Sequence, residues 1–351
     1  MTGRVIGLVS RKWPPAMGGM ETYAVRLSEA LGAYGAIRDL VLPGRANGSP
    51  PTTLALLSWG LLTTLRLLLA RGRFDAVLIC DMAIWPMAVA AGGRKAIAAH
   101  GTDVAFGRRG GVRGRLYSWW LRLGASLTRD VPVVANSQAT AALARDHGFS
   151  DVIVISLATD MRPPAPAPAS HRSLLFAGRL VARKGCGWFI RNVLPHLPED
   201  VTLRVAGTVW DEAEGEALAS PRVMHLGALD SEALALEYAS ALAVIVPNID
   251  VETAEIEGFG LVAVEAAAAG GIVLAAEHSG LVDAVIDGVT GHLLPPGDID
   301  AWRAAVIEVA ALTAEDRGTR QSVSRKAAAA RFSWGRVAEE TAEVLGLKAA
   351  P

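Results

Sequence analysis

The sequence predicts an α/β protein with two domains, each built on a parallel sheet. Short apolar segments alternate with longer amphipathic segments along the chain, which is typical of repeated strand–helix–strand units. Four prolines stand within residues 159–173, where they exclude a helix interior or a sheet strand. The alternation restarts after this segment, so we expect two Rossmann-like domains that face a central cleft.

Composition narrows the function classes before any motif is considered. The 351 residues are 51% hydrophobic with a formal net charge of -1, which predicts large cores and argues against a general affinity for nucleic acid. Cys80 and Cys186 belong to no Cys-x-x-Cys pair, so we expect both to be reduced and buried. The longest apolar region, residues 76–92, is interrupted by Asp81 and Pro86, which argues against a membrane span. We expect a cytoplasmic protein, and contact with the inner face of the membrane stays open.

The alternation of segments gives the boundaries of both domains. The N-terminal domain, on the acceptor side, is expected over 1–160, with strands at 4–10, 38–44, 75–81, 95–101 and 131–137 and helices near 20–32 and 57–72. A linker is expected at 161–172. The C-terminal domain is expected over 173–330, with strands at 173–178, 201–207, 222–228, 242–248 and 271–277. Residues 331–351 are predicted to form a C-terminal helix that returns toward the N-terminal domain.

Ligands of parallel sheets bind beyond the carboxyl ends of the strands, so the loops that follow strands are the informative ones. In the first domain, Gly18 and Gly19 precede a helix and would let an anionic ligand approach the backbone. His100 ends a strand beside Gly101. An ordinary glycine turn and a structural histidine are the competing interpretations.

Two further loops belong to the second domain. Arg179 and Lys184 bracket the loop after a strand, where two cations suit a diphosphate, although most cations of this kind are solvated surface groups. Glu257 and Glu265 flank a Gly-Phe-Gly turn at the start of a helix near Gly260. Carboxylates there suit sugar or ribose hydroxyls, and helix capping is the alternative.

Together these segments resemble the retaining glycosyltransferases of family four, which have the GT-B fold. The resemblance rests on "EGFGLVAVE", "GRLVARKG", "GGMETY", "HGTDV", "NSQAT" and "DAVIDGVTGHLLPPGD", which occur in the family's order over nearly the whole chain. Two departures leave the donor sugar open. Leu281 stands where the family often has glycine and Asp283 where it usually has glutamate, and the acidic insert "NIDVETAEI" precedes Glu257.

The resemblance implies a nucleoside-diphosphate sugar, linked to UDP or GDP, as the donor. Arg179 and Lys184 would neutralise the donor diphosphate, and Glu265 would accept hydrogen bonds from ribose hydroxyls. The remaining implied donor-site residues are Glu257 and His100 by the sugar, the backbone amides of Phe259, Gly260 and Leu261, and Gly18 with Gly19 near the phosphates and acceptor. His100, Glu257, Arg179 and Lys184 are the candidate catalytic residues.

The expected mechanism uses neither a metal nor a cofactor. A helix N-terminus with Arg179 and Lys184 would stabilise the charge that develops on the departing diphosphate. Asp298, in an Asp-Ile-Asp run, is interpreted as a helix cap rather than a metal ligand. Retention could follow from a double displacement with Glu257 as nucleophile, whereas the resemblance favours front-face attack by the acceptor hydroxyl.

The acceptor is less defined than the donor. Residues 106–124 mix five arginines, from Arg108 to Arg122, with Tyr117, Trp119 and Trp120. This mixture suits an anionic membrane surface or a lipid- or polyprenyl-linked hydroxyl acceptor, and a solvated helix with one buried aromatic face is the alternative.

Two other function classes remain open at this point. A nucleotide-sugar 2-epimerase on the same fold would also need cations for the diphosphate and carboxylates for the sugar. A nucleotide-sugar-binding protein without catalysis would need the same cradle, although the retained candidate catalytic residues argue against it. A pyridoxal-dependent phosphorylase fits poorly, because nothing marks a Schiff-base lysine.

Overall fold

The computed structural model describes residues 4–15, 18–45, 51–165, 171–251 and 256–348. The chain divides into two compact units. Unit 1 comprises the described residues within 1–157, 254–259 and 334–351, and unit 2 those within 158–253 and 260–333. Parts of the predicted linker (166–170) and of the acidic insert (252–255) lie outside the described residues.

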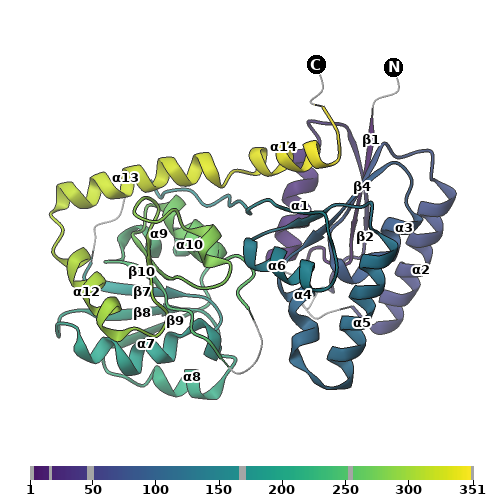
Figure 1. The fold of residues 1–351 in the computed structure, drawn as a ribbon. Coiled ribbons are helices and arrows are strands. Elements are labelled where there is room, and N and C mark those ends of the chain that lie inside the picture. The colour runs from purple at the N-terminus through teal and green to yellow at the C-terminus, as the bar shows by residue number, and fades with distance from the viewer. Residues whose placement is uncertain (1–3, 16–17, 46–50, 166–170, 252–255, 349–351) are drawn as a thin grey trace. The chain divides into compact units, whose positions relative to one another are not determined.

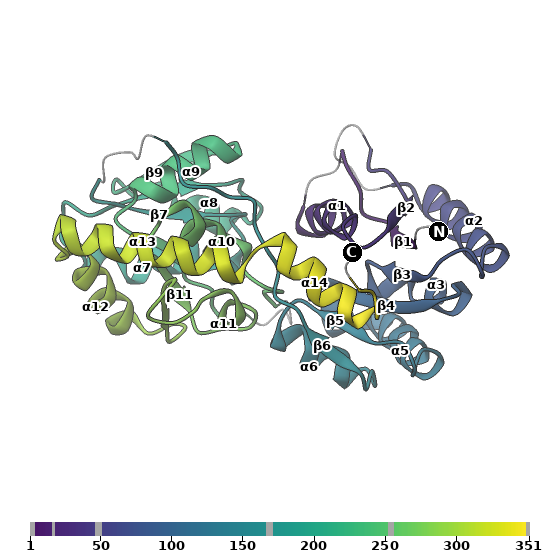
Figure 2. The same ribbon diagram turned by 90° about the horizontal axis from the view of Figure 1, so that it is seen from above.

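Unit 1 (Figure 1) is built on a six-stranded sheet in the order β2-β1-β3-β4-β5-β6, and its strands are labelled in Figure 2. Every pairing is parallel, as the continuous apolar runs of the central strands require for a sheet buried on both faces. The strands are β1 (Val5–Ser10), β2 (Ala36–Val41), β3 (Ala76–Ile79), β4 (Arg94–Ala99), β5 (Val133–Ala135) and β6 (Val152–Val154). The edge strand β6 was not predicted, because its three residues are too few for a clear pattern.

The helices of unit 1, apart from α14, lie between its strands along the chain. They are α1 (Gly19–Leu31), α2 (Thr53–Leu69), η1 (Met82–Ile84), α3 (Pro86–Ala90), α4 (Thr102–Ala105), η2 (Phe106–Arg109), α5 (Gly111–Leu127), α6 (Gln138–Asp146) and α14 (Trp334–Val344). Right-handed crossovers place α1 on one face of the sheet and α2, α3 and α5 on the other. The last helix, α14, packs against α1.

Unit 2 repeats this design with a second all-parallel, six-stranded sheet in the order β12-β11-β10-β7-β8-β9. The strands are β7 (Ser173–Ala177), β8 (Thr202–Ala206), β9 (Val223–Gly227), β10 (Val244–Val246), β11 (Val273–Ala276) and β12 (His292–Leu294). The predicted two-domain α/β fold is confirmed. The sequence pattern missed β12, because its three residues are only half-buried.

The helices of unit 2 bury both faces of its sheet. They are η3 (Ala182–Lys184), α7 (Cys186–Asn192), η4 (Leu194–His196), α8 (Glu212–Ala217), α9 (Ser231–Ser240), α10 (Leu261–Ala269), α11 (Leu281–Ala284), α12 (Ile299–Ala310) and α13 (Ala314–Arg331). Trp302 of α12 is fully buried, with its ring 6.1 Å from that of Trp188 and 5.9 Å from that of Phe189. Its indole N–H donates to the carbonyl of Pro295 at 3.1 Å, which closes this end of the core.

Strand order identifies the place in each unit where a ligand crevice is expected. The chain leaves β1 toward β2 and later returns to β3 on the other side, so the switch point of unit 1 lies between β1 and β3. By the same reasoning, the switch point of unit 2 lies between β7 and β10. A ligand of unit 2 is therefore expected at the carboxyl ends of β7 and β10.

The cysteines and the C-terminal helices can be compared with what the sequence predicts. Cys80 and Cys186 are both free thiols and both buried, as predicted, and burial raises the pKa of each. The helical C-terminal part contains two helices, α13 and α14, with a break at Phe332 and Ser333. Within the described residues, no helix is both long and apolar enough to cross a bilayer.

Asp298 caps α12, as predicted, because its carboxylate accepts a hydrogen bond from the Ala301 backbone N–H at 3.0 Å. We expect Asp298→Ala to lower the free energy of unfolding of unit 2 by about 1 kcal/mol, and Asp298→Asn to retain most of it, since asparagine also caps helices. Chemical denaturation followed by circular dichroism measures both. Equal stability of the alanine variant and the parent would contradict the capping role.

Candidate functional site

The loop after β7 carries the two predicted phosphate-binding cations. Arg179 is exposed, with its guanidinium 5.0 Å from the ring centre of Trp210, which follows β8. Lys184 ends η3 and is only 9% exposed, so it is not one of the solvated surface cations that the alternative interpretation required. The Ala182 N–H donates to the Asp211 carboxylate at 2.7 Å, which anchors η3 to the loop after β8.

Gly185 brings this loop against the loop that follows β10. Its backbone has φ +69°, and a Cβ there would lie 1.9 Å from the carbonyl oxygen of Pro247, so only glycine fits. The Ile249 N–H also donates to the Arg183 carbonyl at 3.1 Å. The two loops on either side of the switch point are therefore fixed to each other, and Lys184 lies where they join.

Helix α10 begins at this edge of the sheet, because it follows β10. Its N-cap is Gly260, which has φ +98° and supplies no side-chain cap. A Cβ on Gly260 would lie 2.4 Å from the side chain of Leu281, so the family departure at Leu281 packs directly against the start of α10. With no capping side chain from Gly260, the first turn keeps the partial positive charge that favours an anion.

Glu265 lies one turn into α10 and is partly buried. Burial raises its pKa, while the Tyr238 hydroxyl, which donates at 3.3 Å, and the positive charge of Lys184 lower it. The carboxylate thus has one neutral donor and one cation near it and retains acceptor capacity. A ligand with hydroxyl groups next to an anionic group would match this arrangement.

His100 occupies a tightly packed position in unit 1. Its backbone N–H donates to Asp103 at 2.8 Å, and its Nε2 lies 3.1 Å from the Cys80 carbonyl, which is an acceptor, so Nε2 is assigned the proton. The Tyr23 ring meets the imidazole edge-on at 4.5 Å. This tautomer leaves Nδ1 as the acceptor nitrogen, which is the atom that a sugar hydroxyl could use.

The glycine loop of unit 1 differs from a simple anion site. Gly18 is the N-cap of α1 and Gly19 is its first residue. The carboxylate of Glu21 folds back toward this helix start, since a Cβ on Gly18 would lie 2.6 Å from Glu21 Oε2. Lys12 Nζ is 3.6 Å from Glu21 Oε1. The protein therefore supplies its own anion here, with a lysine beside it.

The signature segment is shared between the units. Glu257 and Phe259 belong to unit 1, whereas Gly260, Leu261 and Glu265 belong to unit 2. In unit 1, a Cβ on Gly258 would lie 2.4 Å from the His100 carbonyl oxygen, and the Thr140 hydroxyl donates to the Gly258 carbonyl at 3.4 Å. The structure therefore places the segment that contains Glu257 next to His100.

Some residues near these loops were missed by sequence reasoning. Trp210 lies in the loop after β8, and loops that follow strands are where ligand-binding residues are expected, so the sequence does contain a signal for it. Tyr238 lies on α9 and carries no local signal, because its role depends on tertiary contact with Glu265. In unit 1, Asn136 Oδ1 and the Tyr23 hydroxyl are buried with no hydrogen-bond partner among the described residues.

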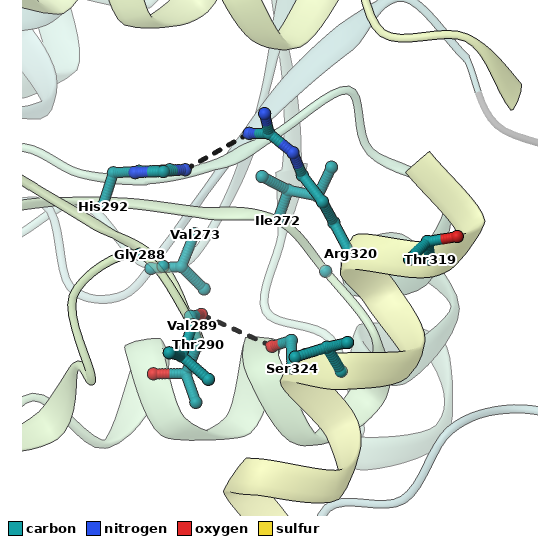
Figure 3. Close-up of a pocket in the computed structure, with 12 residues that line it drawn as sticks. Ile272, Val273, Gly288, Val289, Thr290, His292, Thr319, Arg320 and Ser324 are labelled. Carbon is teal, nitrogen blue, oxygen red and sulfur yellow. Dashed lines mark hydrogen bonds between the residues drawn. The ribbon is translucent and has the colours of Figure 1, made fainter. Parts of the chain in front are cut away.

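A cavity of about 340 Å³ in unit 2 lies away from all of these residues (Figure 3). It is bounded by α13 and by Val273 and His292, which begin β11 and β12, and so it lies at the amino edge of the sheet. Arg320 contacts His292 at 3.4 Å, and Ser324 donates to the Thr290 carbonyl at 3.4 Å across it. The described residues contain no cluster of metal-ligating side chains, at this cavity or elsewhere.

A family model matches much of unit 2 in sequence. Residues 171–311 match the family model described as "Glycosyl transferases group 1". A D-inositol 3-phosphate glycosyltransferase of Xylanimonas cellulosilytica is 34% identical over 206 residues, which are 52% of this chain and 47% of the relative. A protein of the same name from Mycobacterium bovis is 34% identical over 181 residues, which are 48% of this chain and 35% of the relative. The chain thus spans about half or less of the curated relatives it matches.

Solved structures match both units. Sucrose-phosphate synthase from Thermosynechococcus elongatus superimposes with a TM-score of 0.74 at 22% identity, covering 97% of this chain and 98% of that one. Anabaena HepE in complex with UDP-glucose gives a TM-score of 0.72 at 20% identity, covering 97% and 99%. These identities establish the fold alone. The chain therefore has the two-domain GT-B fold, and residues 171–311 are similar in sequence to the group 1 glycosyl transferases.

Proposed function

We propose that the protein is a retaining glycosyltransferase, which moves a hexose from a UDP- or GDP-linked donor to a hydroxyl acceptor without a metal or another cofactor. The observation that carries the proposal is the buried Lys184 at the junction of the β7 and β10 loops, near Glu265 and the start of α10. A cation beside the Glu265 carboxylate, close to a helix that begins with no side-chain cap, suits a diphosphate that carries neighbouring hydroxyl groups. The HepE structure with UDP-glucose supports this choice of donor class.

Different residues would contact the diphosphate, the ribose and the sugar of the donor. Arg179 and Lys184 would hold the diphosphate, the amides of Phe259, Gly260 and Leu261 would contact phosphate or sugar, and Glu265 would accept from ribose hydroxyls. Trp210 would hold Arg179 in place by stacking. On the unit 1 side, His100 and Glu257 would contact the donor sugar, and Gly18 and Gly19 would lie near the phosphates and the acceptor.

In the reaction, the bond from the anomeric carbon to the diphosphate oxygen breaks, and a bond from the acceptor oxygen to that carbon forms. The acceptor hydroxyl proton passes to the departing diphosphate in the front-face route. Arg179, Lys184 and the α10 dipole would stabilise the charge that develops on the diphosphate. In a double displacement, Glu257 would instead attack first and form a glycosyl-enzyme intermediate.

For the acceptor we propose a lipid- or polyprenyl-linked hydroxyl compound, delivered at the inner face of an anionic membrane. A hollow of about 500 Å³ in unit 1 supports this choice. It is lined by Phe106, Arg113, Leu116, Tyr117, Trp119 and Trp120. An apolar hollow with an arginine at its wall suits a lipid chain that carries an anionic linkage.

Incubation with a panel of UDP- and GDP-hexoses, with and without hydroxyl acceptors, tests the function. Transfer with retained anomeric configuration, detected by proton NMR, is the expected result. The names of the matched relatives favour transfer over 2-epimerisation. An epimer formed from a donor alone would instead support the epimerase, and binding without any conversion would support a catalytically inactive binding protein.

Lys184→Ala should weaken UDP binding roughly 10- to 100-fold and lower turnover with it, because the diphosphate loses a desolvated charge-assisted contact. Isothermal titration with UDP measures the affinity. Lys326→Ala, at an exposed position of α13, is the matched control and should bind UDP like the parent. Unchanged affinity in Lys184→Ala would refute the assigned role, provided that its thermal unfolding shows an intact fold.

Glu265→Gln should change both the pH dependence of folding stability and the affinity for UDP. Because burial raises the Glu265 pKa above its unfolded value, the folded protein binds a proton that the unfolded chain releases. The stability of the parent without ligand should therefore fall as pH rises from the ordinary glutamate pKa through the raised one, and the variant should lack this loss. UDP binding should weaken about tenfold, because a hydroxyl loses a charged acceptor.

Urea denaturation at several pH values and titration with UDP measure the two effects of Glu265→Gln. Glu216→Gln, at an exposed position of α8, is the control and should match the parent in both. A variant that is less stable than the parent at neutral pH, yet binds UDP normally, would show that Glu265 is a structural residue.

A further inference from the structure

Helix α2 presents an apolar face to solvent. Seven of its leucines are exposed, between 43% and 79% of their surface: Leu54, Leu57, Leu61, Leu62, Leu65, Leu68 and Leu69. Their spacing of three and four residues puts them along one side of the helix. The side turned to the protein holds only two fully buried residues, Thr63 and Leu67. Most surface helices turn their apolar side to the protein and their polar side to solvent, whereas α2 turns its apolar side to solvent.

Helix α5 continues this pattern with cations added. Val112, Leu116, Trp119 and Leu127 are exposed, with Trp119 at 57%. At 100° per residue they occupy one side of α5, and Arg115 and Arg122 fall along one border of this stripe and Arg113 along the other. Arg113 and Arg115 are exposed and form no ion pair within the described part of the chain. An exposed apolar stripe bordered by arginines is typical of helices that lie in a membrane interface.

The two helices belong to one layer of unit 1. Both connect strands by crossovers on the same face of the sheet, and α3 lies between them (Figure 2). Contacts join α2 to α3, and the Arg71 guanidinium, just after α2, donates to the Ala90 carbonyl at 3.0 Å. On the other side, the Trp120 indole of α5 donates to the Ala83 carbonyl at 3.0 Å and packs 4.8 Å from the Trp85 ring. We call the exposed side chains of α2, α3, η2 and α5 the docking face.

Charge identifies the occupant of this face. Residues 51–127 hold ten lysines and arginines and three acidic residues, although the whole chain has a net charge of -1. The three carboxylates are engaged elsewhere: Asp75 accepts from the Val5 N–H, Asp81 pairs with Arg11 at 2.6 Å, and Asp103 is buried. None of them lies on α2, α3, η2 or α5. The docking face is therefore both apolar and cationic.

We propose that the docking face binds the surface of an anionic phospholipid bilayer. The leucines and Trp119 would enter the boundary between headgroups and acyl chains, and the arginines would contact lipid phosphates. Helix α2 is about 25 Å long and would lie along the membrane plane. A second copy of the chain fits less well, because a two-fold contact through this face would bring its arginines together. This binding extends the membrane contact that was proposed for the acceptor, but it needs no sugar transfer, so the vesicle experiments can fail while transfer is observed, and the reverse.

Flotation of the full chain with vesicles tests the proposal. The protein should float with phosphatidylglycerol–phosphatidylcholine vesicles, stay in solution with phosphatidylcholine alone, and lose binding as salt rises. The triple variant Leu57→Ser, Leu61→Ser, Leu65→Ser should bind at least about tenfold more weakly, because three apolar side chains no longer enter the interface. Arg113→Gln with Arg115→Gln should weaken binding by about tenfold at low salt.

The matched controls lie outside the docking face. Leu236→Ser, Ile307→Ser and Val323→Ser change three apolar side chains of unit 2 that are each more than 40% exposed. Arg38→Gln, on β2 of unit 1, with Arg303→Gln of unit 2 removes two exposed cations. Both controls should bind like the parent. Brominated lipid should quench the parent more than Trp119→Phe, and Trp210→Phe should be quenched like the parent.

Three results would overturn the proposal. The first is equal flotation of the leucine variant and its control, and the second is equal flotation with neutral and anionic vesicles. The third is a dimer in lipid-free solution that the leucine variant abolishes, with no vesicle binding by the parent. Because the quenching measurement uses the parent and single tryptophan changes, it decides the matter even if the triple variant folds poorly.

Discussion

The parallel pairing of β7 with β10 is the constraint on which the candidate site depends. Val244 pairs with Leu175 and Ile245 with Phe176, so the two strands end at the same edge of the sheet. The loop with Arg179 and Lys184 then meets the loop that leads to α10, and Gly185 permits the close approach. A shift in this register would separate the cations from the helix start, although each would keep its local structure.

Glu265 and Lys184 are placed at some expense of stability. Burial raises the pKa of the carboxylate, and the lysine is only 9% exposed. Charged groups in such surroundings favour folding less than apolar side chains of similar size would. The proposed nucleoside-diphosphate donor carries both anionic and hydroxyl groups and would therefore account for their presence at the switch point of the sheet.

Sequence reasoning identified the strongly periodic elements and the loops that follow strands. It located both sheets, the Asp298 cap and the loops of Arg179, Lys184 and Glu265, because these depend on local pattern and strand order. It missed β6 and β12, which have three residues each, and Tyr238, whose relation to Glu265 depends on tertiary packing. Periodicity predicts a helix near residues 57–72 but does not show which side of it faces the protein, so the exposure of the α2 leucines could not be predicted.

Hydrogen exchange of the full chain with and without UDP tests whether a diphosphate binds at the carboxyl ends of β7 and β10. UDP is expected to slow exchange at residues 178–186 and in the first turn of α10, where amides would meet the diphosphate. Residues 288–292, beside the cavity of Figure 3, should exchange at an unchanged rate. Protection confined to residues 288–292, or no protection at saturating UDP, would contradict a diphosphate site at the carboxyl ends of β7 and β10.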